Sequence, residues 1–264
     1  SFFGSFGGLT CFQAPSLDRD AIFECMRRRR HFATTGNRMI LDVTARTQSD
    51  AMLFSRDPDL FEGAAFERTR TLTMGDIARV ADDEVELEVD VVGSAPIERL
   101  EILCGTEVME VVRPYGPDDL GRRVRLVYQG AEYRGRARTT TWDGELALDG
   151  NAITAAEMFN NWNLDRGIQR QSASGLAWKA VTTGNHGGID IWLGNGLDGR
   201  VSFETKLVRG CRDIASLGLE HHIFSAGGLE RDIRLYRLPE RMTETRVRFK
   251  RLDRPARLDH GALA

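Results

Sequence analysis

The chain has 264 residues, of which 41% are hydrophobic and 28% charged, a composition typical of a globular protein that can bury a core. Its 36 basic and 39 acidic residues give a formal net charge of −3, which removes the overall electrostatic reason to expect nucleic acid as a partner. No run of residues approaches the roughly 20 apolar positions that a membrane-spanning helix needs. We therefore expect a soluble protein with no membrane span, and leave the cytoplasm and the periplasm open as its compartment.

The first expected element is a helix near the N-terminus. Ser16 is the predicted N-cap, and Asp18 and Asp20 lie in the first turn. An apolar stripe follows over residues 21–26, and the four arginines Arg27–Arg30 come at the end of the helix. Positive charge complements the dipole at a helix C-terminus. A solvated helix end is therefore favoured over a nucleic-acid patch.

After this helix the pattern changes to a period of two. Val85, Leu87, Val89 and Val91 alternate with acidic residues, which predicts a strand with one buried and one solvated face. Gly105-Thr106 is typical of a hairpin turn between two strands. Residues 47–75 are expected to be irregular. Further strands of the first half are expected at 39–45, 97–103, 107–112, 122–128 and 133–141.

The second half continues the β pattern with one interruption. Thr154 and Glu157 have the spacing of a capping box, so a short helix is expected at 154–159. Glycine-rich turns at 184–188 and 194–199 separate the neighbouring segments. Strands are expected at 176–182, 189–193, 201–208, 232–238 and 244–249. The sequence therefore predicts a mainly β fold, an antiparallel β-sandwich with an N-terminal helix and one short additional helix.

The cysteines and histidines do not fall into a catalytic or metal-binding motif. The four cysteines are widely separated, so buried free thiols are favoured over two disulfides. His221 and His222 are adjacent and would point to opposite faces of a strand. A metal site could form from His186, His221 and Glu220 only through tertiary contact. Histidines without a metal are favoured, and we expect no catalytic residue and no cofactor in this chain.

The tryptophans are the candidates for ligand binding. Trp142, Trp162, Trp178 and Trp192 could stack on sugars or on another domain if they were exposed on one face of a sandwich. Asparagines around Trp162 would add polar groups to such a site. Large aromatic side chains dominate protein cores, so burial is the favoured interpretation.

Three stretches resemble segments of one known family. They are Gly7-Gly8-Leu9-Thr10 with the helix at 21–30 and Phe32-Ala33-Thr34-Thr35-Gly36, then residues 93–103, and then residues 178–185 with Gly188-Ile189-Asp190. The family is DUF3604, whose N-terminal part is similar to PHP-type (polymerase and histidinol phosphatase-like) metallohydrolases. The first stretch looks like the last βα turn of that metal-binding barrel.

The resemblance implies a division of the chain and a partner for it. Residues 1–38 would be the closing βα unit of a PHP-like barrel, with its helix left from that barrel. Residues 39–264 would be a β-sandwich accessory region, with a possible sub-boundary near 150. The metal ligands of the family would then lie upstream of Ser1, in a barrel of the same protein that holds a divalent metal and hydrolyses phosphoesters.

Three functional hypotheses follow from these observations. The first is a non-catalytic region that supports or caps the hydrolase barrel. The second is a carbohydrate-binding or other ligand-binding sandwich that uses the tryptophans. The third is a self-contained hydrolase built around His186, His221 and Glu220. A homo-oligomer remains open in each case.

Overall fold

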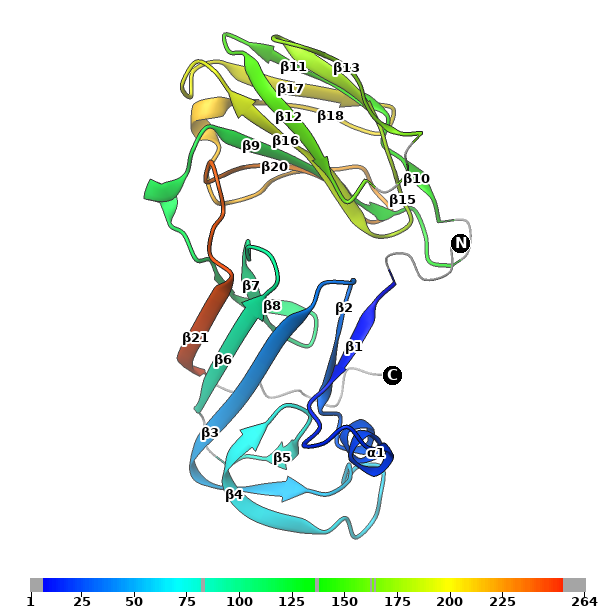
Figure 1. The fold of residues 1–264 in the computed structure, drawn as a ribbon, viewed down its shortest axis with the longest axis vertical. Coiled ribbons are helices and arrows are strands. Elements are labelled where there is room, and N and C mark those ends of the chain that lie inside the picture. Colours follow the sequence, from blue (N-terminus) through cyan, green and yellow to red (C-terminus); the bar gives the residue numbers. More distant parts are fainter. Residues whose placement is uncertain (1–6, 82–83, 136–137, 162, 164, 254–264) are drawn as a thin grey trace. The chain divides into compact units, whose positions relative to one another are not determined.

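The computed structural model describes residues 7–81, 84–135, 138–161, 163 and 165–253. The fold is mainly β with several antiparallel sheets, and the described residues contain one α-helix, α1 (Arg19–Arg27) (Figure 1). That helix is too short to span a membrane, and the described residues contain no other candidate span. All four cysteines are free thiols.

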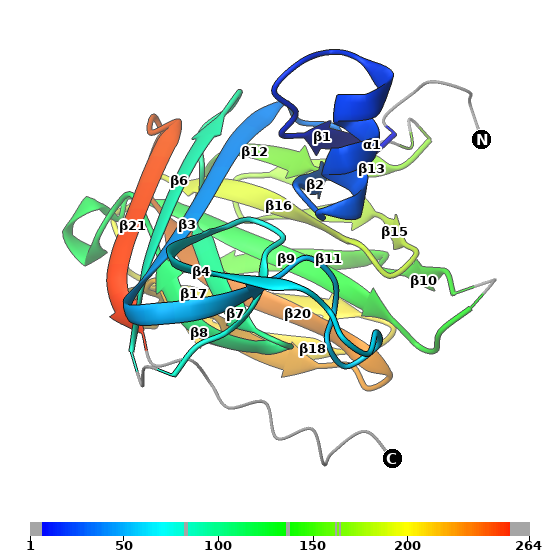
Figure 2. The same ribbon diagram turned by 90° about the horizontal axis from the view of Figure 1, so that it is seen from below.

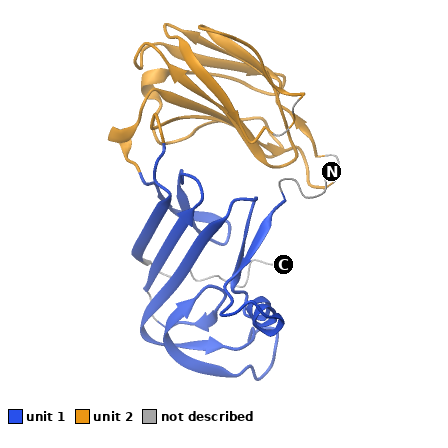
Figure 3. Cartoon of the chain, in the orientation of Figure 1, with its two compact units in different colours: residues 1–114, 242–264 blue, residues 115–241 orange. Residues whose placement is uncertain are grey.

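The chain divides into two compact units (Figure 3). Unit 1 comprises residues 1–114 and 242–264, and unit 2 comprises residues 115–241. Residue 38 lies inside unit 1, between two strands, and residue 150 lies inside unit 2. The expected division after residue 38 stays a prediction.

Unit 1 is built around one larger antiparallel sheet with the order β21-β6-β3-β4, and β5 also pairs with β3. Figure 2 shows β21, β6 and β3 side by side. The pairs β1-β2 and β7-β8 form separate two-stranded ladders. The strands are β1 (Leu9–Phe12), β2 (His31–Thr34), β3 (Met39–Phe54), β4 (Phe66–Thr73), β5 (Ile77–Arg79), β6 (Val85–Gly93), β7 (Leu100–Cys104), β8 (Glu107–Val112) and β21 (Arg246–Asp253).

Several predictions for unit 1 are confirmed. The alternating valines form β6, with Val89 and Val91 buried, and the predicted hairpin is β7-β8. The region 47–75 is not irregular throughout, because β3 continues to Phe54 and β4 pairs with it. The two strands that flank α1 pair antiparallel with each other. The barrel origin of this segment stays a prediction.

The N-terminus of α1 corrects the predicted cap. Asp18, not Ser16, is the N-cap, and its carboxylate accepts a hydrogen bond from the Ala21 N–H at 2.9 Å. The Ser16 hydroxyl donates to the same carboxylate. These two hydrogen bonds lower the pKa of the Asp18 carboxyl.

Unit 2 contains two five-stranded antiparallel sheets, with the orders β13-β14-β11-β17-β18 and β12-β16-β9-β20-β19, and a short β10-β15 ladder. Its strands are β9 (Arg123–Ala131), β10 (Thr140–Thr141), β11 (Gly144–Asp149), β12 (Ile153–Phe159), β13 (Gly167–Ser172), β14 (Gly175–Lys179), β15 (Val181–Thr182), β16 (His186–Leu193), β17 (Arg200–Thr205), β18 (Arg209–Asp213), β19 (His222–Ser225) and β20 (Leu229–Leu238). Two 3-10 turns, η1 (Pro117–Asp119) and η2 (Ile214–Ser216), complete the unit.

One hydrophobic core lies between these two sheets. Leu146 and Phe203 come from the first sheet, and Ile191 and Leu235 come from the second. All of them belong to one cluster of buried side chains that also contains Trp142 and Trp178. Two sheets that share one core are typical of a β-sandwich.

Two expectations for unit 2 are wrong. Residues 154–159 belong to strand β12, not to a short helix, because this segment pairs with β16 from Ile153 to Phe159. The Thr154 hydroxyl donates to the Trp192 carbonyl at 3.0 Å, so it does not cap a helix. Of the expected strand at 133–141, the residues that the structure describes retain only Thr140–Thr141 as a strand. The sequence analysis also missed β11, β13, β18 and β19.

Candidate functional site

The structure separates the three candidates for a metal site. His186 is the first residue of β16 and pairs with Gln129 of β9. His221 and Glu220 precede β19, and the His221 ring stacks on Tyr236 with ring centroids 4.1 Å apart. Strands β9 and β20 lie between β16 and β19, and three strand spacings amount to about 14 Å. The described residues contain no group of three His, Cys, Asp or Glu side chains that could hold a metal ion.

Two of the four tryptophans belong to the core of unit 2. Trp142 and Trp178 are 0% and 1% exposed, so neither ring has a face available to a ligand from solution. The Trp142 indole N–H donates to Thr182 Oγ1 at 2.9 Å. Trp192 is half-buried beneath the Arg123 guanidinium, 5.1 Å from its ring centroid. Trp162 lies outside the described residues.

A cavity of about 270 Å³ lies at the end of unit 2 where His186 begins β16. Its walls come from the end of β9 and the loop after it, from the turn between β15 and β16, and from the start of β20. Polar side chains dominate the lining; those that matter for its chemistry are Gln129, Arg134, Arg138, Asn185, His186 and Glu230. We call this cavity the arginine pocket.

The floor of the arginine pocket is fixed by the backbone of Gly130. Its N–H donates to the Asn185 carbonyl at 3.3 Å, and its own carbonyl accepts from the Thr182 hydroxyl at 3.1 Å. Gly130 has φ +84°, and a Cβ atom there would lie 2.3 Å from the Glu230 carbonyl oxygen. Only glycine fits this position. Three segments that are distant in sequence therefore meet at one residue.

The turn before β16 is held by local hydrogen bonds. The Thr183 N–H donates to Asn185 Oδ1 at 2.8 Å. Gly184 has φ +93°, which favours glycine, and the Arg138 side chain lies next to it, since a Cβ at Gly184 would be in ordinary contact with Arg138 Nε at 3.5 Å. The glycine-rich turn predicted from the sequence thus lies beside an arginine of the pocket.

Arg134 and Arg138 are both exposed, and neither has an ion pair or hydrogen bond with another described residue. Glu230 is the acidic residue in the lining. The sequence analysis missed both arginines because it assigned their segment to a strand, where they would belong to a solvated face. The signal was present: Tyr133-Arg134-Gly135 and the following arginines form a short basic, glycine-containing stretch.

Asp190 is a buried carboxylate of unit 2 that accepts hydrogen bonds from two arginines. Arg125 donates to Asp190 through Nε at 2.6 Å and through Nη2 at 2.8 Å, and Arg123 donates to the same carboxylate. The Arg125 guanidinium also lies over the Phe159 ring, 4.3 Å from its centroid. Two cations neutralise this carboxylate, so it is a structural ion pair and no free general base.

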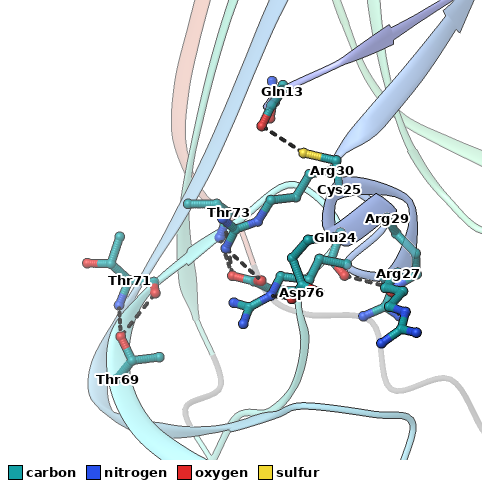
Figure 4. A network of polar contacts seen from close by, with 12 residues as sticks. Gln13, Glu24, Cys25, Arg27, Arg29, Arg30, Thr69, Thr71, Thr73 and Asp76 are labelled. Atoms are coloured by element: carbon teal, nitrogen blue, oxygen red, sulfur yellow. Dashed lines mark hydrogen bonds and ion pairs between the residues drawn. The ribbon is translucent and has the colours of Figure 1, made fainter. Parts of the chain in front are cut away.

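The arginines at the end of α1 have partners within unit 1 (Figure 4). Arg28 Nε pairs with Glu24 Oε1 at 2.6 Å, and Arg29 Nε donates to the Gly75 carbonyl at 2.8 Å. An ion pair of 3.7 Å joins Arg30 to Asp76. The contacts of Arg29 and Arg30 connect the end of the helix to the turn after β4, whereas the Arg28 pair lies within the helix.

The exposed apolar side chains are distributed unevenly. Of the fifteen large apolar residues that are exposed in the described part of the chain, eleven belong to unit 1. Leu17, Leu60 and Ile40 are the most exposed, at 96%, 76% and 67%. The eleven, called the unit 1 apolar set, are Leu9, Leu17, Phe23, Met26, Ile40, Leu60, Phe61, Phe66, Leu103, Val108 and Met109.

Comparison with known proteins gives one match. The sequence model of a family described as a protein of unknown function (DUF3604) matches residues 3–103. This match supports membership of the DUF3604 family. The matched residues lie within unit 1 and contain nine of the eleven members of the unit 1 apolar set. No curated protein and no solved structure matches the chain.

Proposed function

We propose that this chain is a non-catalytic β-rich accessory region of a DUF3604 protein. In this proposal unit 1 packs against a PHP-like, metal-dependent hydrolase barrel of the same protein, and supports or caps that barrel. The observation that carries the proposal is the unit 1 apolar set. The hydrolase character of the partner, with its divalent metal and phosphoester substrate, rests on the resemblance of stretches within residues 7–36 to the last βα turn of such a barrel.

The burial of the two units supports a docking role for unit 1. Of the apolar residues that are buried in the described part of the chain, 23 belong to unit 2 and seven to unit 1. The buried cluster around the larger sheet of unit 1 consists of Val89, Val91 and Phe249. Contiguous exposed apolar patches mark interaction surfaces in soluble proteins, and we propose that the unit 1 apolar set forms such a patch. Covering them stabilises a complex by about 25 cal/mol per Å² of apolar surface.

The polar groups of unit 2 support a non-catalytic role. His186 starts β16 and His221 precedes β19, and two other strands separate β16 from β19. Asp190 is bonded to two arginines, and Asp232 accepts two hydrogen bonds from Arg234, at 2.9 and 3.0 Å. A general base needs a carboxylate or imidazole within reach of the proton that it takes.

A matched pair of variants tests the docking surface. Ile40 in unit 1 is 67% exposed and Ile223 in unit 2 is 56% exposed, and both lie on strands. We expect Ile40→Asp to weaken binding of this chain to the separately expressed barrel by at least about tenfold, a loss of about 1.4 kcal/mol. Ile223→Asp should leave the binding unchanged. Titration calorimetry measures both; equal effects of the two substitutions would contradict the proposal.

A second experiment tests whether metal binding and catalysis belong to the barrel and not to this chain. The whole protein and this chain are assayed side by side for bound metal and for hydrolysis of p-nitrophenyl phosphate. We expect metal and turnover in the whole protein alone. Stoichiometric metal and turnover in this chain by itself would overturn the non-catalytic role.

A further inference from the structure

We propose that the arginine pocket of unit 2 binds a small polar molecule that carries a tetrahedral oxyanion, as a phosphate or sulfate ester does. The inference goes beyond the docking role of unit 1 and does not depend on it. It rests on the unpaired donors that share the pocket, on the fixed pocket floor and on the size of the cavity.

The positive charges of the pocket favour the binding of an anion. Arg134 and Arg138 line the same cavity, and neither has an anionic partner among the described residues. Two other arginines of unit 2 have acidic partners: Arg166 pairs with Asp143 at 2.9 Å, and Arg170 pairs with Glu145 at 3.0 Å. Two positive charges in the lining of one cavity favour the binding of an anion there. Guanidinium groups bind phosphate and sulfate oxygens through paired N–H donors.

Neutral donors in the same lining add to this site. Asn185 Oδ1 is held by the Thr183 N–H, while no described residue accepts a hydrogen bond from the Asn185 side-chain NH₂ group. Gln129 lies beside it at the end of β9, and its amide makes only a long contact of 3.5 Å with Asp232. Amide donors of this kind bind the remaining oxygens or the hydroxyl groups of a polar ligand.

Backbone contacts hold one wall of the pocket in a defined position. Gly130, with its two hydrogen bonds and its close approach to Glu230, fixes the floor before any ligand arrives. Because of this preorganisation, binding requires less ordering of the chain. The volume of about 270 Å³ exceeds what an oxyanion alone occupies, and lies just below the range of small-molecule pockets. A ligand the size of a phosphorylated or sulfated monosaccharide fits these limits. Glu230 carries the opposite charge and disfavours ligands with several anionic groups.

Titration calorimetry with four probes tests the ligand class: glucose 6-phosphate, glucose 6-sulfate, gluconate and glucose. We expect one or both esters to bind at least about tenfold more tightly than glucose and gluconate. Preference between the two esters then identifies the group. Tighter binding of gluconate than of either ester, or no binding of any ester up to about 10 mM, would overturn the inference.

Charge-removing variants test the site. Arg134→Gln and Arg138→Gln should each weaken ester binding about tenfold, because each removes one charge-assisted contact. Arg209→Gln is the matched control, since Arg209 is an exposed arginine of unit 2 outside the pocket. Its binding should equal that of the wild type. A second measurement needs no variant: NMR chemical shifts of the Gly130 and Asn185 amides should change when the ester is titrated into the wild-type chain. Equal loss in all three variants, or shifts confined to other residues, would contradict the proposed site.

Discussion

Units 1 and 2 are both antiparallel β structures, yet they bury their apolar side chains to different extents. In unit 2 two five-stranded sheets cover each other, so that Leu126 and Leu146 meet in one core. The described part of unit 1 has one larger sheet, two short ladders and one helix around a buried cluster of three residues. A sheet needs a second layer to cover its apolar face. The contrast indicates that unit 2 supplies its own second layer, whereas we propose that unit 1 receives part of its cover from another domain.

The largest effect is expected at the buried ion pair of unit 2. Asp190→Asn leaves Arg125 and Arg123 without their anion, and we expect it to cost about 3–5 kcal/mol of the free energy of unfolding. All four tryptophans belong to unit 2, so urea denaturation followed by tryptophan fluorescence reports this loss. Asp213→Asn, at the exposed pair with Arg200, is the control and should cost at most about 1 kcal/mol. Similar losses of unfolding free energy for Asp190→Asn and Asp213→Asn would contradict the burial of the Asp190 ion pair.

The next effect compares the two cores directly. Leu235→Ala, at a fully buried position of unit 2, should lower the free energy of unfolding by about 2–5 kcal/mol. Leu87→Ala, at a half-buried position beside the cluster of unit 1, should cost about 1 kcal/mol. Amide exchange of β20 and β6 measures each effect in its own unit. Equal losses of unfolding free energy for the two variants would contradict the proposed difference between the two cores.

A glycine of unit 1 gives a smaller effect. Gly75 has φ +86°, and a Cβ there would lie 2.3 Å from the Arg28 carbonyl oxygen. Gly75→Ala should therefore cost about 1–3 kcal/mol and speed amide exchange at the end of α1. Gly105→Ala is its control, because Gly105 also has positive φ but no atom within 4 Å of the added Cβ. If the control is the more destabilising of the two, the contact between α1 and the turn after β4 is wrong.

The smallest effect is expected at an exposed counterpart of the buried ion pair. Hydrogen bonds from Arg246 and Arg248 lower the pKa of Asp90 from 3.8 to about 2. A lowered folded-state pKa stabilises the protein above the unfolded pKa, and this contribution is lost as the pH falls from about 4 to about 2. Asp90→Asn should remove that part of the acid dependence, so that the variant is slightly less stable than the wild type above about pH 4 and equally stable near pH 2. Acid unfolding followed by circular dichroism tests it; identical acid profiles would contradict the ion pair.

Much of the fold could be predicted from local pattern. The alternating valines of β6 and the glycine turn of the β7-β8 hairpin gave the correct elements, because one face of each strand is buried and the turn chemistry is local. Residues 154–159 did not follow their capping box, because pairing with β16 satisfies the backbone of that segment. Tertiary pairing outweighs a local helix signal of this kind.

The candidate site was harder to predict. His186 and its glycine-rich turn were singled out from the sequence, and they line the arginine pocket. Arg134 and Arg138 were missed, because their positions in the pocket depend on Gly130 meeting Glu230 from a strand about 100 residues away in the sequence. Such long-range contacts leave no local periodicity. The same limit applies to the tryptophans, whose burial depends on the closure of two sheets.

Hydrogen exchange of the whole protein, compared with that of this chain alone, tests the docking of unit 1 most directly. We expect the amides of α1, β3 and the β7-β8 hairpin to exchange more slowly in the whole protein, while those of β9, β16 and β20 exchange at the same rate in both. Equal exchange of unit 1 in the two proteins would contradict the account, as would a gene that encodes no barrel beside this chain.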